Sequence, residues 1–400
     1  MPNSILSPTA VTREALRILH QKCNFIGAIN RQYDESFARS GAKIGDTLKI
    51  RLPNQYAVRT GAAMSSGDTS EQSTTLQVAT QKGVDMNFSS AELSLGLDDF
   101  SKRVLEPAVS VLAAAIEADA LSMRRDVYQQ VNNIGSAATF AKLLAGRKRL
   151  EDSLTPPAGR TALLNTQDNA DLVDALKGLF HDDDSIARQY REGAMGRTAG
   201  FDFFENTHLA NHVCGARGGT PLINGATADG ATQIVTDGWT NSVTGVVKVG
   251  DVFEINGVNA VHPETKVDLG VRQQFVVTAD ANSNGSGQST LQISPAIVVS
   301  GPRQNVTNVP ADNAALTFQG AGNQSYGQSL LFQEDAFTFA TADLVMPRGV
   351  DWAAREVWDG ISMRIVRQYD INNDKFPCRI DVLYGYKTLR PQLACRLANN

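Results

Sequence analysis

The chain has 400 residues, of which 42% are hydrophobic and 20% are charged, and its formal net charge is −5. This length is too great for one small core and predicts two or three packed units. The acidic balance argues against a dedicated nucleic-acid-binding protein, which usually carries an excess of basic residues.

The first quarter of the chain predicts one helix followed by extended segments. Thr12 is a plausible N-cap for a helix that should run to about Cys23. The expected inner face of this helix is made by Leu16, Leu19, His20 and Cys23. Residues 46–60 and 73–89 then alternate like half-buried strands around a small, polar stretch. Little apolar sequence is left to pack beneath these strands, so we expect a hairpin that lies on another surface.

The strongest predicted helix begins at Pro107, which suits a first turn, and runs to about Asn132. Its apolar residues recur every three or four positions and form one stripe, consisting of Leu112, Ile116, Ala120, Met123, Val127 and Val131. At 1.5 Å per residue, this helix would be a rod of roughly 40 Å. A second amphipathic helix is expected at 170–180, with Leu172, Ala175, Leu176 and Leu179 together, and a short one at 185–190.

From about Ala216 the composition shifts to glycine, threonine, asparagine and valine with almost no helical pattern. Strand-like runs are found at 232–239, 246–258, 272–280 and 289–299. Short strands separated by turn residues over about 100 residues predict a small antiparallel barrel or sandwich, inserted between 216 and 322. Further strands are expected at 334–347 and 360–389, with a tight turn at INNDK.

The stretch 191–215, REGAMGRTAGFDFFENTHLANHVCG, imitates two kinds of active site. Its glycines, Gly193, Gly196 and Gly200, are spaced like a phosphate loop but lack the Gly-Lys-Ser/Thr ending that such a loop needs. The aromatic run GFDFF reads as a strand whose Phe201, Phe203 and Phe204 pack, with the glycines supplying backbone geometry. Nucleotide binding is therefore not expected.

The same stretch contains His208 and His212 four residues apart, with Cys214 nearby. These residues could hold a metal, and a metal-dependent enzyme is one alternative, but the glutamate of H-E-x-x-H is missing. The acidic run at 182–184 lacks the pattern of a calcium loop, and no G-x-S-x-G elbow occurs. We favour structural roles for both histidines and predict no catalytic residue, cofactor-binding residue or metal ligand.

Two further features limit the function. The cysteines, Cys23, Cys214, Cys378 and Cys395, lie far apart and read as buried thiols. No run approaches about 18 apolar residues and the first residues lack a signal-peptide pattern, so we expect no membrane span and no leader. The segment 361–400 carries seven basic residues against three aspartates, which we interpret as solvated strand faces and ion pairs between chains more readily than as a nucleic-acid patch.

Taken together, these segments resemble a known family, the major capsid proteins of tailed bacteriophages in the P22-like branch of the Hong Kong 97 (HK97) fold. The segments that carry the resemblance are YREGAMGRTAGFDFFENTHLANHVCG, VKVGDVFEINGVNAVHPETK, QFVVTA, LQISPAIVVSGPRQNV, DAFTFATADLVMPRGV and VRQYDINNDKFPCRIDVLYGYKTLRPQLACRL. They occur in family order over most of the C-terminal half. The N-terminal half is similar mainly in its organisation of arm, extended loop and long helix.

The resemblance implies an α+β capsid fold with an inserted antiparallel β-barrel. The implied parts are an N-terminal arm at 1–45, an extended loop at 46–92, a peripheral domain with its spine helix at 93–136, an axial domain at 137–215, the inserted barrel at 216–322, a return of the axial domain at 323–335 and the C-terminal strands of the peripheral domain at 336–400.

The resemblance also implies a structural protein that self-assembles, through hexamers and pentamers, into an icosahedral shell. Its implied partners are a scaffolding protein, a portal protein and double-stranded DNA held weakly on the inner face. The implied location is the virion, assembled in the bacterial host cytoplasm. Contacts between subunits are expected from charged residues of the extended loop: Lys49, Arg51, Arg59, Asp68 and Glu71.

Two points remain open beside this interpretation. Some relatives crosslink their subunits through lysine and asparagine, but Lys82 is poorly placed near the base of the extended loop, so we do not expect such a bond. The alternative to a shell protein is a ligand- or glycan-binding β-barrel on a virion or cell surface. The barrel has Trp239 as its single tryptophan and no concentrated aromatic patch, which disfavours this alternative.

Overall fold

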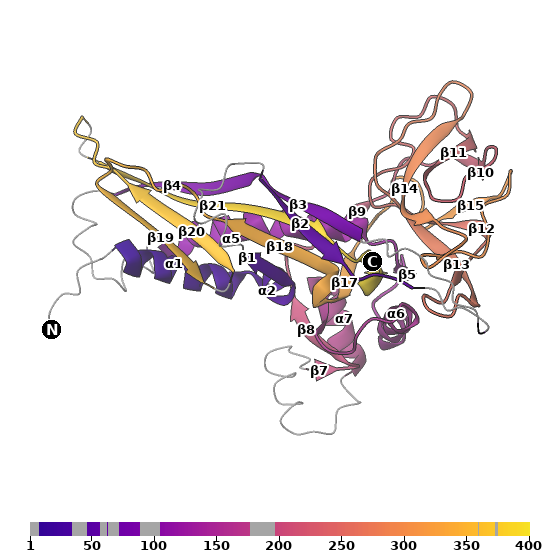
Figure 1. Ribbon diagram of the computed structural model, residues 1–400, viewed down its shortest axis with the longest axis horizontal. Coiled ribbons are helices and arrows are strands. Elements are labelled where there is room, and N and C mark those ends of the chain that lie inside the picture. Colours follow the sequence, from indigo (N-terminus) through magenta and orange to yellow (C-terminus); the bar gives the residue numbers. More distant parts are fainter. Residues whose placement is uncertain are drawn as a thin grey trace. The chain divides into compact units, whose positions relative to one another are not determined.

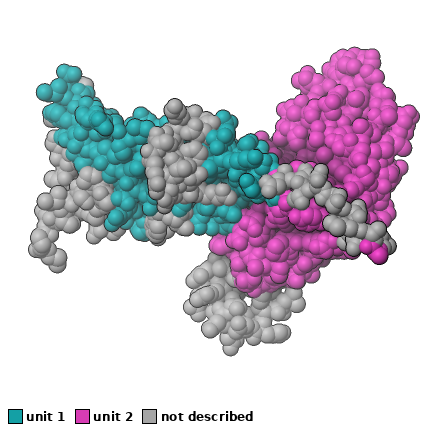
Figure 2. Space-filling view, in the orientation of Figure 1, with its two compact units in different colours: residues 1–52, 73–122, 337–389 teal, residues 53–72, 123–336, 390–400 magenta. Residues whose placement is uncertain are grey.

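The computed structural model describes residues 8–33, 46–56, 62, 72–88, 105–176, 197–358, 360–372 and 375–400. The chain divides into two compact units, each assembled from segments far apart in sequence (Figure 2). Unit 1 contains Met1–Leu52, Ser73–Ser122 and Phe337–Leu389, and unit 2 contains Pro53–Gln72, Met123–Ala336 and Arg390–Asn400.

Unit 1 is built on a six-stranded sheet (Figure 1). The strands run in the order β1 (Asn30–Tyr33), β18 (Phe337–Ala342), β21 (Phe376–Thr388), β20 (Ile361–Arg367) and β19 (Trp352–Trp358), and β4 (Thr80–Phe88) also pairs with β21. The β1–β18 pair is parallel and the other pairs are antiparallel. The two long strands predicted on either side of INNDK are confirmed as β20 and β21.

Helix α1 (Pro8–Lys22) packs on β19 and β20 and begins four residues before the predicted N-cap. The prediction for Thr12 was wrong, because this side chain is wholly buried inside the helix. A proline is tolerated in the first turn of a helix, which lets the helix begin at Pro8. The predicted inner face is confirmed at Leu16 and Leu19, both of which are buried.

Helix α5 (Glu106–Leu121) is shorter than predicted. Pro107 occupies its first turn as expected, but the chain then forms a 3-10 turn, η3 (Ser122–Asp126), and a short strand, β5 (Gln130–Asn132). The predicted helical stripe is buried throughout, although its last part is not helical. Strand β5 pairs in parallel with β22 (Ala394–Ala398), so tertiary hydrogen bonds override the local helical pattern there.

A buried carboxylate fastens the N-terminal segment to α5. Glu117 is completely buried, and its two oxygens accept the backbone N–H groups of Phe25 at 2.6 Å and Ile26 at 3.3 Å. Both donors lie in the first turn of α2 (Asn24–Ala28), where N–H groups have no partner within the helix. Glu117 therefore supplies the acceptors that this helix end needs.

Replacing Glu117 with alanine should lower the free energy of unfolding by about 2–3 kcal/mol, because two buried N–H groups lose a charged acceptor. Chemical denaturation of the purified chain measures this loss. The control is Glu106→Ala, an exposed glutamate in the first turn of the same helix, which should change the free energy by less than about 1 kcal/mol. Equal losses in the two variants would contradict the anchoring role of Glu117.

The extended segment forms a two-stranded sheet from β2 (Asp46–Leu52) and β3 (Gln72–Val78). The expectation that this hairpin lies on another surface is confirmed at its base. Leu76 and Val78 are buried, and Leu48 and Ile50 pack against the same cluster, which includes Ala340, Ala342, Leu344 and Leu383 of unit 1. The stretch predicted as one strand at 73–89 is divided at Ala79, so that β3 pairs with β2 while β4 joins the main sheet.

The first part of unit 2 is a sheet with two helices. Its strand order is β5, β22, β17 (Gln328–Gln333), β6 (Arg160–Leu164), β8 (Phe201–Glu205) and β7 (Arg197–Thr198). Helix α6 (Phe140–Asp152), which the sequence analysis missed, packs against β22 and contributes Leu143 and Leu150 to the core. Residues 336–400, predicted as one group of strands, are thus shared between both units.

Helix α7 (Thr166–Leu176) corresponds to the second predicted helix but begins four residues earlier. Leu172 is buried as expected, whereas Ala175 is exposed, so the predicted inner face is only partly confirmed. Leu179, the predicted helix at 185–190 and the acidic run at 182–184 lie outside the described residues.

The inserted segment of unit 2 is a six-stranded antiparallel sheet (Figure 1). The order is β10 (Gly219–Ile223), β11 (Ala231–Trp239), β14 (Ser289–Ile297), β13 (Asp268–Val277), β12 (Val252–Val261) and β15 (Leu316–Phe318). Its first and last strands meet at a bridge between Leu222 and Ala315, which curves the sheet back on itself as a barrel requires. Buried side chains such as Phe253, Phe275 and Val277 fill the space that it encloses.

Candidate functional site

The inserted segment joins the rest of unit 2 through a neck of two short paired strands. The incoming strand is β9 (His212–Val213) and the outgoing strand is β16 (Ser325–Tyr326). Next to them, the N–H of Cys214 donates to the carbonyl of Gln324 at 2.9 Å. The stretch that imitated an active site in the sequence therefore ends at this neck.

The preceding part of that stretch is structural where it is described. Phe201 is buried in the sheet core and Phe203 packs against it, whereas Phe204 is 42% exposed, so the packing role predicted for it was wrong. Gly200 has a φ of +84°, a conformation that suits glycine, which confirms its role in backbone geometry. Gly193 and Gly196 lie outside the described residues.

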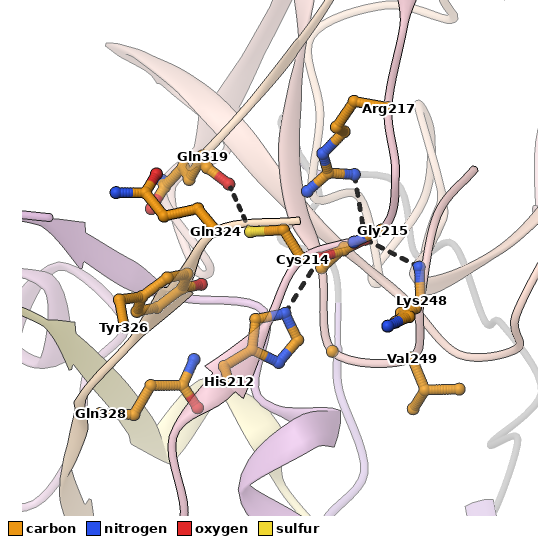
Figure 3. Close-up of polar contacts among 12 residues, drawn as sticks. His212, Cys214, Gly215, Arg217, Lys248, Val249, Gln319, Gln324, Tyr326 and Gln328 are labelled. Carbon is orange, nitrogen blue, oxygen red and sulfur yellow. Dashed lines mark hydrogen bonds and ion pairs between the residues drawn. The ribbon is translucent and has the colours of Figure 1, made fainter. Parts of the chain in front are cut away.

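Asp251 is buried beside the neck at the centre of a polar cluster. Its partners His212, Gly215, Arg217 and Lys248 are labelled in Figure 3. Its Oδ1 lies 2.9 Å from Nε2 of His212. Its Oδ2 accepts the backbone N–H groups of Gly215 at 3.1 Å and Lys248 at 2.7 Å. Nη1 of Arg217 lies 2.9 Å from the same oxygen as an ion pair. One carboxylate thus connects the incoming chain to the turn that precedes β12.

Burial and hydrogen bonding act in opposite directions on this cluster. Burial alone would raise the pKa of Asp251, but the hydrogen bond with His212 and the charge of Arg217 hold that pKa below its usual value. Burial lowers the pKa of His212, and the nearby charge of Arg396 lowers it further, so the imidazole is neutral at pH 7. The cluster therefore pairs an ionised carboxylate with a neutral imidazole.

Arg217 pairs with this carboxylate, and Arg124 and Arg396 lie near enough to its partner His212 to lower the pKa of that imidazole. Arg217 also lies over the ring of Phe318, with its Cζ 4.1 Å from the ring centre. Arg124 donates from Nη2 to the carbonyl of Ala210 at 2.7 Å, and burial, helped by the neighbouring Arg125 and Arg396, lowers its pKa to about 10. The positive charges converge because the neck brings η3, β22 and the start of the insertion together.

Glutamines extend the polar contacts between the sheet and the barrel. The backbone of Gln130 in β5 donates to Gln274 of β13 at 2.8 Å and accepts from it at 3.1 Å. The side chain of Gln130 donates to Gln319 at 2.8 Å and to the hydroxyl of Tyr326 at 3.2 Å. Gln328 donates to Gln130 at 3.4 Å. These residues could not be found from the sequence, because buried glutamine has no motif and their partners lie far away in the chain.

The predicted metal alternative is only partly assembled. His212 and Cys214 do come together with Asp251 as a possible three-ligand group, but His208 does not join them. The atoms that would bind a cation are already engaged: Asp251 is saturated by donors, and the Cys214 thiol donates to the carbonyl of Gln319 at 3.7 Å. Burial raises the pKa of that thiol, and the surrounding arginines would repel a cation, so the donor set does not fit a metal.

The pH dependence of stability should report the neutral state of His212. Because its pKa is lower in the folded protein than the ordinary 6.5, stability from this group is complete above that pH and is lost as the pH falls below it. Thermal unfolding followed between about pH 7 and pH 5 should therefore show a steeper loss in the wild type than in His212→Gln. Parallel profiles for the two proteins would contradict this assignment.

The barrel does not support the glycan-binding alternative. Trp239 is 4% exposed and donates from Nε1 to Thr236 at 2.8 Å, so it is a core residue and not a stacking platform for a sugar.

Among the predicted contact residues of the extended loop, Lys49 and Arg51 are exposed on β2. Arg59, Asp68 and Glu71 lie outside the described residues.

Three arginines of the basic C-terminal segment pair with aspartates of the same chain. Arg364 and Arg379 both pair with Asp381, at 2.6 and 2.7 Å. Arg367 pairs with Asp351 at 2.8 Å. These three ion pairs lie within one chain, and ion pairs between chains stay a prediction. Lys82 likewise pairs with Asp119 at 2.7 Å.

The two main sheets, the extended hairpin and the inserted barrel have the organisation expected of a structural coat protein. A family model described as "P22 coat protein - gene protein 5" matches residues 30–396, and the chain belongs to this family. As a member, it is a major capsid protein, whose copies assemble into an icosahedral shell and reside in the virion. None of the helices in the described part of the chain is long and apolar enough to span a membrane.

Comparisons with solved structures find distant similarities to viral capsids and related particles. A structure from Mycobacterium phage Che8 is 13% identical, with 92% of this chain and 89% of that chain covered and a TM-score of 0.46. The capsid of cyanophage P-SCSP1u is 10% identical, with 93% and 86% covered and a TM-score of 0.42. A virus-like particle from Pyrococcus furiosus is 6% identical, with 96% of both chains covered and a TM-score of 0.38. No curated protein matches the chain.

Proposed function

We propose that this capsid protein assembles, through hexamers and pentamers, around a scaffolding protein in the cytoplasm of a bacterial host. A portal protein joins the shell, which then encloses double-stranded DNA. The observation that carries this proposal is the family match over 30–396. The hairpin of β2 and β3 supports it, because an arm that contacted a neighbouring subunit would suit a shell held by many moderate contacts.

The parts of the chain take distinct roles in this proposal. The N-terminal arm is 1–45 and the extended loop is 46–92. The sheet and spine helix of unit 1 form most of the peripheral domain, at 93–136 and 336–400. The axial domain takes 137–215 and 323–335, and the inserted barrel takes 216–322. The charged residues of the extended loop, Lys49, Arg51, Arg59, Asp68 and Glu71, contact neighbouring subunits.

The packaged DNA touches the shell weakly and without sequence preference. Tight binding would need a row of free cations that neutralise phosphates. The net charge is −5, and the arginines at 364, 367 and 379 are engaged by aspartates of the same chain. The shell therefore encloses the DNA without binding it tightly.

The protein works without catalysis. The best candidate for a reactive group is the cluster of His212, Cys214 and Asp251. Its carboxylate is saturated by N–H donors and an arginine, and its thiol is buried and protonated. The role of this cluster is structural: it connects the incoming chain to the turn that precedes β12.

Electron microscopy of the chain co-expressed with its scaffolding protein tests the proposal. We expect closed particles tens of nanometres across, and a double variant, Lys49→Glu with Arg51→Glu, should give few particles although its subunit melts like the wild type. Lys148→Glu, an exposed change on α6, serves as the control and should assemble. A wild-type chain that stays monomeric with scaffold present would refute the proposal.

A further inference from the structure

Arg396 of β22 is a buried arginine with an unusual set of contacts. Its side chain is completely buried, and Nη1 donates to the backbone carbonyl of Gly250 at 2.9 Å. Gly250 precedes the carboxylate that centres the polar cluster. Arg396 thus reaches from the sheet of unit 2 into the base of the inserted barrel.

The other two nitrogens of this guanidinium, Nε and Nη2, are buried and have no hydrogen-bond partner within the described part of the chain. Together they form the edge of arginine that normally grips a carboxylate or phosphate through two parallel N–H bonds. Leaving charged donors buried without an acceptor is strongly unfavourable. This edge therefore requires an acceptor that the described part of the chain does not supply.

The neighbouring groups make an anion a better acceptor than another polar side chain. The carboxylate of Asp251 is already saturated by His212, Arg217 and two backbone N–H groups. Arg124 adds a second guanidinium near Arg396, and its own donors go to Gln328 and the carbonyl of Ala210. Asp251 and Asp126 also act on Arg396 through their charge, but neither accepts a hydrogen bond from Nε or Nη2, which an anion can do.

We propose that the neck of the inserted barrel binds one small inorganic anion, held by the Nε–H and Nη2–H groups of Arg396. The anion accepts both hydrogen bonds and neutralises the positive field at the base of the barrel. The two donor atoms are closed off from bulk solvent, which favours a chloride-sized ion over a large phosphate ester. This anion is a structural ligand that fastens the barrel to the sheet.

Thermal unfolding of the purified full chain at constant ionic strength, with sodium chloride replacing sodium gluconate, tests this site. The wild type should show a saturable rise of about 2–4 °C in Tm as chloride increases. Arg396→Gln should lose the saturable rise, and Arg396→Lys should lose most of it, because an ammonium group lacks the two-donor edge. Arg272→Gln, an exposed arginine of the same barrel, is the control and should keep the wild-type response.

If the Arg396 variants do not fold, the wild type still decides the question. A cryo-EM map of shells kept in sodium bromide should show density stronger than that of a water beside Nε and Nη2 of Arg396. A Tm that does not depend on chloride would overturn the proposal. Density in the bromide map no stronger than that of a water would also overturn it.

Discussion

Replacing Asp251 with alanine should lower the free energy of unfolding of the full chain by about 3–5 kcal/mol, the usual loss when one partner of a buried ion pair is removed. The substitution leaves the guanidinium of Arg217 without its counter-ion. It also deprives His212 and the backbone N–H groups of Gly215 and Lys248 of their acceptor.

A graded pair of variants separates the charge from the hydrogen bonds. Asp251→Asn keeps one oxygen acceptor but removes the charge. Its free energy of unfolding should therefore lie between those of the wild type and Asp251→Ala. Asp280→Asn is the control, since Asp280 is exposed and accepts one backbone N–H, from Val249, in the same part of the barrel. Its effect should stay below about 1 kcal/mol.

Denaturant-induced unfolding measures these losses at the barrel when Trp352 and Trp358 are replaced by phenylalanine, so that the fluorescence comes from the buried Trp239 alone. If Asp251→Ala unfolded at the same denaturant concentration as Asp280→Asn, the cluster would not be what stabilises the neck. If the overall free energy of unfolding fell while the Trp239 signal changed at the wild-type denaturant concentration, the carboxylate would stabilise only the attachment of the barrel. If the cluster stabilises both the neck and the barrel, the denaturant midpoints of the Trp239 signal and of the overall unfolding must shift together.

Much of the barrel could be predicted because its strands carry their signal locally. The runs around 232–239 and 289–299 combine alternating burial with turn residues at both ends, and they correspond to β11 and β14. Asp251 carries no such signal. It follows a glycine in a segment that reads as a turn and a strand, and its partners His212 and Gly215 lie 39 and 36 positions away. Only the folded neck brings them together.

The helix predicted to reach Asn132 shows a second limit of local pattern. Met123, Val127 and Val131 are buried, so the apolar period was a true signal of burial but not of backbone conformation. What ends α5 near Leu121 is pairing between β5 and β22, whose residues are more than 260 positions apart. A short stretch of sequence does not include a pairing partner so far away, and helix propensity is too weak to outweigh the hydrogen bonds of that pairing.

Replacing Gly385 with alanine should lower the free energy of unfolding by about 3–5 kcal/mol, through overpacking together with loss of apolar burial. A Cβ at this position of β21 would lie 2.2 Å from the carbonyl oxygen of Gln77 and 3.0 Å from the Cα of Val78. Both are backbone atoms of β3, so no rotamer change can relieve the contact. Strand β3 must move away, and Leu76 and Val78 then lose their place in the core.

The matched control is Gly27→Ala, because a Cβ there meets no atom within 4 Å, and an alanine in helix α2 should be neutral or slightly stabilising. Denaturant unfolding measures both variants, and hydrogen exchange at Leu76 and Val78 shows whether β3 has moved. Wild-type stability in Gly385→Ala, with both amides still protected, would mean that β3 does not lie against this glycine.

The effect on assembly should exceed the effect on stability, because β3 is the base from which the extended hairpin projects. Glu117→Ala weakens unit 1 by a comparable amount at a different place and leaves the contact between β3 and β21 intact. Comparing particle yields of the two variants by electron microscopy, at a temperature where both are folded, separates the two effects. We expect particles from Glu117→Ala and few from Gly385→Ala. Equal yields would show that the position of the hairpin base does not control how subunits join.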